Sequence, residues 1–147
     1  VENFQSLRGD AVSEPVASPD INTAEMSSSA LLGAALMFVA GLDGDIHKTE
    51  QEVIRRVCSF HPGAFDQAHE YYQKHRLEEL YEELSLTPQQ ALCYYANMLE
   101  LAMADGVLDR NEQQLLRQFA GIFGVSHSDC ESIRSVLLIK NQLSVLD

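Results

Sequence analysis

The stretch Leu101-Ala102-Met103-Ala104-Asp105-Gly106-Val107-Leu108-Asp109-Arg110-Asn111-Glu112 decides how this chain is expected to fold. An apolar helical run ends at Asp105, and Gly106 stands where a left-handed residue closes a helix. Asp109 and Glu112 have the spacing of a capping box, which begins the next helix. The stretch therefore predicts two helices joined by an acidic turn.

The same pattern occurs earlier, where residues 40 to 50 read Ala-Gly-Leu-Asp-Gly-Asp-Ile-His-Lys-Thr-Glu. One constant offset relates the two copies, because 105 − 43 and 112 − 50 both equal 62. It pairs Asp43 with Asp105, and Glu50 with Glu112. The chain is therefore predicted to be a duplicated helix-turn-helix.

The rest of the chain is also predicted to be helical. Residues 30 to 42 and 88 to 104 are apolar nearly all round, which is typical of central, buried helices. No stretch alternates with a period of two, so strands are not expected. We predict an all-α fold, a compact bundle of about six or seven helices with a pseudo-twofold axis. Residues 1–22 are expected to form a flexible acidic leader, and residues 23–147 a single helical domain.

Composition restricts the partners. With 22 acidic and 10 basic side chains the formal charge is −12, which repels nucleic acid and anionic lipid and attracts cations and basic proteins. The apolar run over residues 30 to 42 has 13 residues and is too short to span a bilayer, so no membrane insertion of this domain is expected. Cys58, Cys93 and Cys130 are interpreted as reduced core cysteines of a cytoplasmic protein.

The candidate functional residues are the carboxylates of the two turns. They are Asp43, Asp45, Glu50, Asp105, Asp109 and Glu112. If the central helices run antiparallel the turns lie far apart, and if they cross steeply the turns can approach and hold a divalent cation. Asp43 and Asp105 oppose the dipole of the preceding helix, so each needs a neutralising group: an amide, an arginine (Arg55 or Arg117) or an ion. Capping alone and cation binding both remain open.

Known metal motifs do not fit the turns. An EF-hand loop requires glycine at position 6 and glutamate at position 12, where the first turn has Lys48 and Ile54 and the second has Arg110 and Leu116. No glutamate is followed by histidine three residues later, as a di-iron bundle requires. Nucleophile elbows, phosphate-binding loops and dinucleotide glycine patterns are also missing from the sequence.

The two phrases Gly41-Leu42-Asp43-Gly44-Asp45-Ile46-x-x-x-Glu50 and Ala104-Asp105-Gly106-Val107-Leu108-x-x-x-Glu112 resemble the TerB family of tellurite-resistance proteins. The resemblance extends over about Ser28 to Leu138. It implies a compact helical domain, usually bacterial and without established enzymatic activity, whose acidic residues bind a metal ion or a partner. The chain departs from the pattern at Gly41-Leu42, where the second copy has Met103-Ala104, and at His47.

Two functional hypotheses follow. The first is a non-catalytic module of the kind associated with tellurite and stress responses, which binds an unidentified protein partner through acidic surface and a divalent cation at its turns. The acidic residues Glu78, Glu79, Glu82 and Glu83 form one candidate surface for a basic partner. The alternative is a small metal-dependent enzyme that uses the same turn carboxylates. The first is preferred because neither a nucleophile nor a general base accompanies the carboxylates. The sequence does not determine the oligomeric state.

Overall fold

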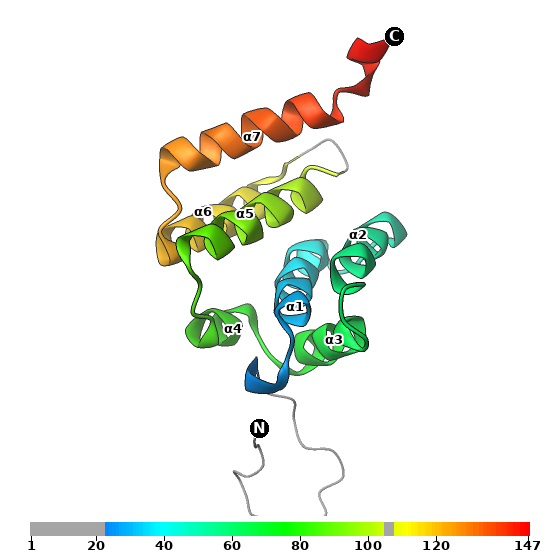
Figure 1. The fold of residues 1–147 in the computed structure, drawn as a ribbon, viewed down its shortest axis with the longest axis vertical. Coiled ribbons are helices and arrows are strands. Elements are labelled where there is room, and N and C mark those ends of the chain that lie inside the picture. The colour runs from blue at the N-terminus through cyan, green and yellow to red at the C-terminus, as the bar shows by residue number, and fades with distance from the viewer. Residues whose placement is uncertain (1–22, 105–107) are drawn as a thin grey trace, which may run out of the picture.

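The computed structural model of the chain describes residues 23–104 and 108–147 (Figure 1). This part contains seven α-helices and three short 3-10 helices, and the predicted all-α fold is confirmed. The helices are η1 (Thr23–Glu25), α1 (Ser28–Ala40), η2 (Gly41–Asp43), α2 (Lys48–Cys58), α3 (Ala64–Lys74), α4 (Leu77–Glu83), α5 (Pro88–Ala102), α6 (Arg110–Phe123), α7 (His127–Asn141) and η3 (Leu143–Leu146).

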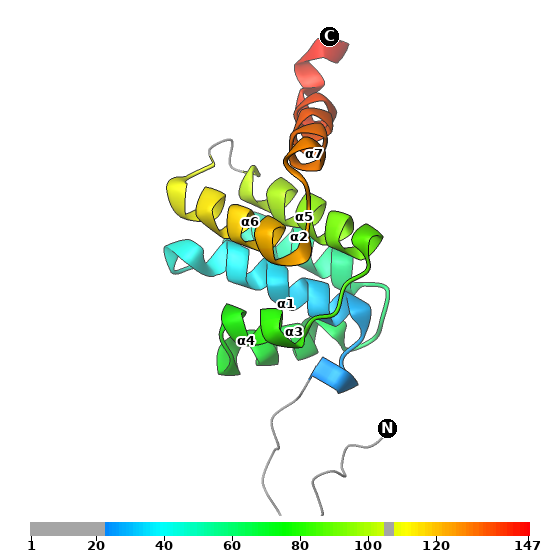
Figure 2. The same ribbon diagram turned by 90° about the vertical axis from the view of Figure 1, so that its left-hand side faces the viewer.

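Helix α1 is the centre of the bundle. Ser27 caps it by accepting a hydrogen bond from the backbone N–H of Ala30, and nine of its residues are buried. Because its side chains are apolar on every side, α1 can pack against α2, α3, α4 and α5 at once (Figure 2). The prediction of a buried central helix is confirmed, although the α-helix ends at Ala40 and continues as η2.

Helix α5 is the second central helix and packs beside α1. Thr87 and Pro88 begin it, and the Thr87 hydroxyl accepts a hydrogen bond from the Gln90 backbone. A cluster of aromatic rings joins α4, α5 and α6: Phe119 lies 5.9 Å from Tyr81, 6.0 Å from Tyr94 and 4.7 Å from Phe123, measured between ring centroids.

Helices α1 and α5 run in broadly the same direction, so their C-terminal ends lie on the same side of the molecule (Figure 2). Three helices, α2, α3 and α4, separate them in the chain and return it to its starting side. The arrangement is therefore neither antiparallel nor a steep crossing, the two alternatives considered from the sequence. The duplication and its pseudo-twofold axis stay a prediction.

Two further expectations concern the chain ends and the cysteines. The predicted leader, residues 1–22, lies outside the described residues. Cys58 is buried and Cys130 half-buried, but Cys93 is exposed, so the assignment of all three to the core was wrong for Cys93. Within the described ranges, none of the helices is both long enough and apolar enough to cross a membrane.

Candidate functional site

The second acidic turn ends in a complete capping box. The Asp109 carboxylate accepts a hydrogen bond from the Glu112 backbone N–H at 2.8 Å, and the Asp109 N–H donates to the Glu112 carboxylate at 3.1 Å. Negative charge at the start of α6 also interacts favourably with the helix dipole. The capping prediction made from the Asp-x-x-Glu spacing is confirmed.

The first acidic turn repeats part of this geometry. The His47 backbone N–H donates to the Glu50 carboxylate at 2.9 Å, which is the counterpart of the bond between Asp109 and Glu112. The side-chain amide of Gln51 donates to the Ile46 carbonyl at 3.3 Å, and that of Gln113 donates to the Leu108 carbonyl at 3.0 Å. The starts of α2 and α6 thus share these two contacts, 62 positions apart.

The two turns meet at one cavity of about 230 Å³. The C-terminal end of α1 and the start of α2 form one side, and the residues that follow α5 and begin α6 form the other. The lining residues are Val39, Ala40, Leu42, His47, Thr49, Glu50, Ala104, Asp109 and Glu112. Three of the six predicted ligands, Glu50, Asp109 and Glu112, therefore face a common space. This convergence could not be derived from the sequence.

The other three predicted ligands are not part of this cavity as described. Asp45 lines a different cavity of about 410 Å³ between α1, α2 and α3. The side chain of Asp43 and the whole of Asp105 lie outside the described residues. The neutralising groups predicted for these two residues therefore stay predictions. Among the described residues, no group of three or more histidine, cysteine, aspartate or glutamate side chains is arranged to hold a metal ion.

The arginines considered as neutralising groups have other surroundings. The guanidinium of Arg55 lies 3.9 Å from the centre of the Phe65 ring, a cation–π contact, and it lines the cavity that Asp45 also lines. Arg117 lies on α6 and lines two cavities, neither of which includes a described carboxylate of the turns.

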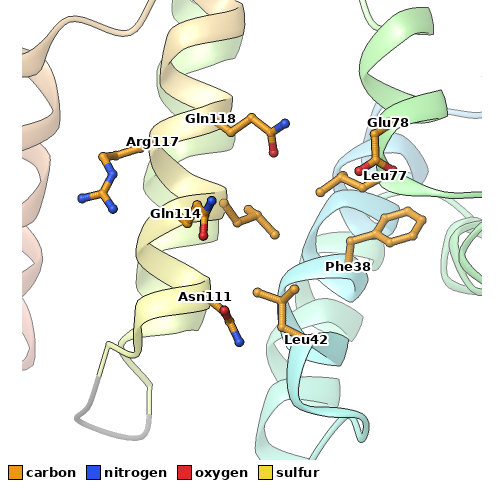
Figure 3. A pocket seen from close by; sticks show the side chains of 9 residues that line it. Phe38, Leu42, Leu77, Glu78, Asn111, Gln114, Arg117 and Gln118 are labelled. Carbon is orange, nitrogen blue, oxygen red and sulfur yellow. The ribbon is translucent and has the colours of Figure 1, made fainter.

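A groove adjoins the turn cavity and shares Leu42 with it (Figure 3). It measures about 680 Å³ and separates α6 from α1, η2 and α4. Its apolar residues are Phe38, Leu42, Leu77 and Leu115, and its polar residues are Glu78, Asn111, Gln114, Arg117 and Gln118. Figure 3 shows the Arg117 side chain directed away from α4, so the groove is faced mainly by apolar groups, amides and one carboxylate.

Only part of the predicted acidic face on α4 is directed at this groove. Glu78 lines it, whereas Glu79 accepts a hydrogen bond from the Arg76 backbone at 2.7 Å and Glu83 accepts one from the Thr23 hydroxyl at 2.6 Å. The groove itself was missed from the sequence because its walls come from helices far apart in the chain. The one available signal was Leu42, an apolar residue between Gly41 and Asp43, and its side chain is 39% exposed.

Residues 63–135 match the family model of tellurite resistance protein TerB. The chain contains a TerB-family domain. The matched residues extend from Gly63, just before α3, into α7 and include the second acidic turn. The first turn lies outside the match, which begins later than the resemblance predicted from Ser28. No curated protein and no solved structure matches the chain.

Proposed function

We propose that this TerB-family chain is a non-catalytic acidic module of the kind associated with tellurite and stress responses. It binds a hydrated divalent cation where its two turns meet, and it docks a protein partner in the adjoining groove. We further propose that it works in the bacterial cytoplasm, which is consistent with its free cysteines, since a reducing compartment keeps thiols unpaired.

The observation that carries the cation proposal is the shared cavity. Glu50, Asp109 and Glu112 from both turns line one small space, where a cation would reduce their mutual repulsion. Since these described side chains are not arranged to hold an ion directly, the ion would be held through its waters. Oxygen ligands of this kind favour hard cations such as Mg²⁺ and Ca²⁺. A cavity of about 230 Å³ accepts an ion together with several of its waters, since a water molecule takes about 30 Å³. Mg²⁺ characteristically keeps such waters.

The hydrogen bonds of these carboxylates support a binding role rather than catalysis. One oxygen each of Glu50, Asp109 and Glu112 is used to begin a helix. A general base needs to reach a substrate proton, whereas a carboxylate fixed to the backbone is suited to holding an ion in place. A bound cation would therefore tie the start of α2 to the start of α6.

The experiment compares melting temperatures after chelation and after addition of Mg²⁺, Ca²⁺, Mn²⁺ or Zn²⁺. An ion at 100 times its dissociation constant stabilises a protein by about 2.7 kcal/mol, which corresponds to roughly 5–11 °C for a chain of this size. The test variant is Glu50→Gln with Glu112→Gln, because glutamine keeps the capping hydrogen bond and removes the charge. Glu82→Gln, on the exposed side of α4, is the control.

The proposal expects the ion-induced shift in the wild type and the control, and its loss in the double variant. If none of the four ions moves the melting temperature, or if the double variant keeps the full shift, the cation site does not exist at this cavity.

The partner proposal rests on the groove beside the turns. A basic amphipathic helix could bury apolar residues against Leu77 and Leu115 and bring a basic side chain to Glu78. The test is affinity capture with wild type, Glu78→Lys and the control Glu82→Lys. Proteins retained by the wild type and the control but lost from Glu78→Lys support groove docking. Equal retention by all three forms would argue against it.

A further inference from the structure

The C-terminal half of α7, together with η3, carries the largest concentration of exposed apolar side chains in the described chain. They are Val136, Leu138, Ile139, Leu143, Val145 and Leu146, each between 50% and 80% exposed. Leu137 is the buried residue of α7. Both ribbon views show this half of the helix extending beyond the rest of the bundle (Figures 1 and 2).

These side chains are separate from the side of α7 that packs on the bundle. Cys130, Ile133 and Leu137 recur at helical spacing on the inner side. Val136 and Ile139, three positions apart, share a different side, so they cannot turn inward without moving the inner residues outward.

An ion pair between Lys140 and Glu100 holds α7 against α5 at this end. Val136 and Ile139 therefore point away from the side of α7 that packs on the bundle. The largest exposed apolar patch of a protein is often a functional contact surface.

We propose that this face is covered by a second copy of the chain, through a twofold pairing of α7 with α7. The first argument is area. An exposed aliphatic side chain offers on the order of 100 Å², so six side chains at these exposures offer roughly 400 Å² per copy. A standard-size interface of a reversible complex contributes about 800 Å² per partner, of which about 57% is apolar, or roughly 450 Å².

The second argument is charge. The chain carries a net charge of −12, so two copies repel one another over most of their surface. From Ser132 to Leu146 there is no aspartate or glutamate, and the charged residues are Arg134 and Lys140. Within residues 132–146, two copies therefore bring no aspartate or glutamate side chains together, and the nearest ones in the chain are Glu131 and Asp147. An anionic membrane would have to approach the same strongly acidic chain, which makes it the poorer occupant.

The pairing leaves the proposed function intact. A twofold interface uses the same patch on both copies, so Val136 and Ile139 of each protomer lie against the partner's α7. None of the described residues that line the turn cavity or the groove belongs to α7 or η3. The dimer would thus present two acidic sites to a common partner, which raises avidity without new contacts.

The experiment is sedimentation equilibrium of the protein over a wide concentration range, at low and high salt. The test variant is Val136→Ser with Ile139→Ser, and the control is Phe60→Ser, which removes an exposed apolar side chain elsewhere. We expect a reversible dimer in the wild type and the control. In the test variant the dissociation constant should rise about a hundredfold or more, since four side chains leave a twofold interface. Salt should strengthen the dimer by screening the net charge.

Circular dichroism melts check that both variants fold, which their exposed positions favour. A wild type that remains monomeric at millimolar concentration overturns the proposal, and so does a dimer that the test variant retains. Binding of the wild-type monomer to phosphatidylcholine vesicles would assign the face to a lipid surface instead. The cation-induced shift in melting temperature is measured on the test variant as well. The dimer proposal and the cation proposal are therefore tested independently of each other.

Discussion

Gly41 explains how the first turn is fixed to α3, and it provides a sharp test of the packing. Its φ of −85° is open to any residue, so its backbone does not require glycine. Glycine is required because there is no room for a side chain. A Cβ added there would lie 2.1 Å from the Tyr72 hydroxyl oxygen and 3.0 Å from the ring carbon that carries it. The Tyr72 ring also packs edge-on against Phe38, with centroids 5.1 Å apart.

The expected cost of Gly41→Ala follows from two opposing effects. Overfilling a packed site costs about 1–3 kcal/mol. Replacing glycine at a compatible φ returns about 0.4–1 kcal/mol by restricting the unfolded chain. We therefore expect a net loss of about 1–2 kcal/mol. In a Tyr72→Phe background the hydroxyl oxygen that lies 2.1 Å from the added Cβ is removed. The ring carbon at 3.0 Å then needs to move only slightly to make room for the Cβ. The same substitution should then be nearly neutral, a coupling of about 1–2 kcal/mol.

Urea unfolding of the four proteins of this cycle, followed by circular dichroism, measures the coupling. Gly121→Ala is the matched control, because a Cβ at Gly121 meets no atom within 4 Å and the position is inside α6. This control should gain about 0.5–1 kcal/mol. If Gly41→Ala costs the same in both backgrounds, or stabilises as the control does, the hydroxyl does not fill the space that the structure gives it.

The remaining predictions concern the aromatic core. Phe119→Ala should cost about 3–5 kcal/mol in urea unfolding, because the ring is fully buried between helices. Tyr81→Phe should be neutral or stabilising by the same measurement, because its buried hydroxyl has no hydrogen-bond partner among the described residues. Burial, helped by the carboxylates of Glu83 and Glu79, raises the pKa of Tyr71 to about 12. The contribution of Tyr71 to stability should be constant below about pH 10, where unfolded tyrosine begins to ionise, and should be lost as the pH rises from about 10 to 12. A tyrosinate absorbance titration checks this shift.

Local features of the sequence predicted the helices well, because their causes are local. Thr87 and Ser126 begin helices because their side-chain oxygens accept a hydrogen bond from the helix backbone, and Gly124 ends one in the left-handed conformation. Residues 75 and 76 separate α3 from α4. The assignment of Cys93 to the core was wrong because α5 is apolar on most sides but not all. Cys93 lies on the exposed side of α5 and lines a cavity, which the hydrophobic period of the helix does not predict.

The sequence predicted which residues of the candidate site begin helices, but it did not predict how the residues of the two turns lie relative to one another. Capping boxes need only four consecutive residues, so Asp109 and Glu112 could be assigned from spacing alone. The approach of Glu50 to these residues depends on the direction of α5 relative to α1, which is set by the packing of the helices between them. Helix spacing contains no information on that direction.

The two turns differ in sequence, since the first has Gly41 where the second has Met103. The structure explains the glycine of the first turn. At the first turn the Tyr72 hydroxyl of α3 occupies the space of a side chain, so glycine is required and η2 is held against α3. At the second turn Met103 itself is half-buried and packs against the core. The first turn is therefore positioned by a contact from another helix and the second by its own side chain. A perturbation of Tyr72 should disturb the Glu50 side of the shared cavity before the Glu112 side.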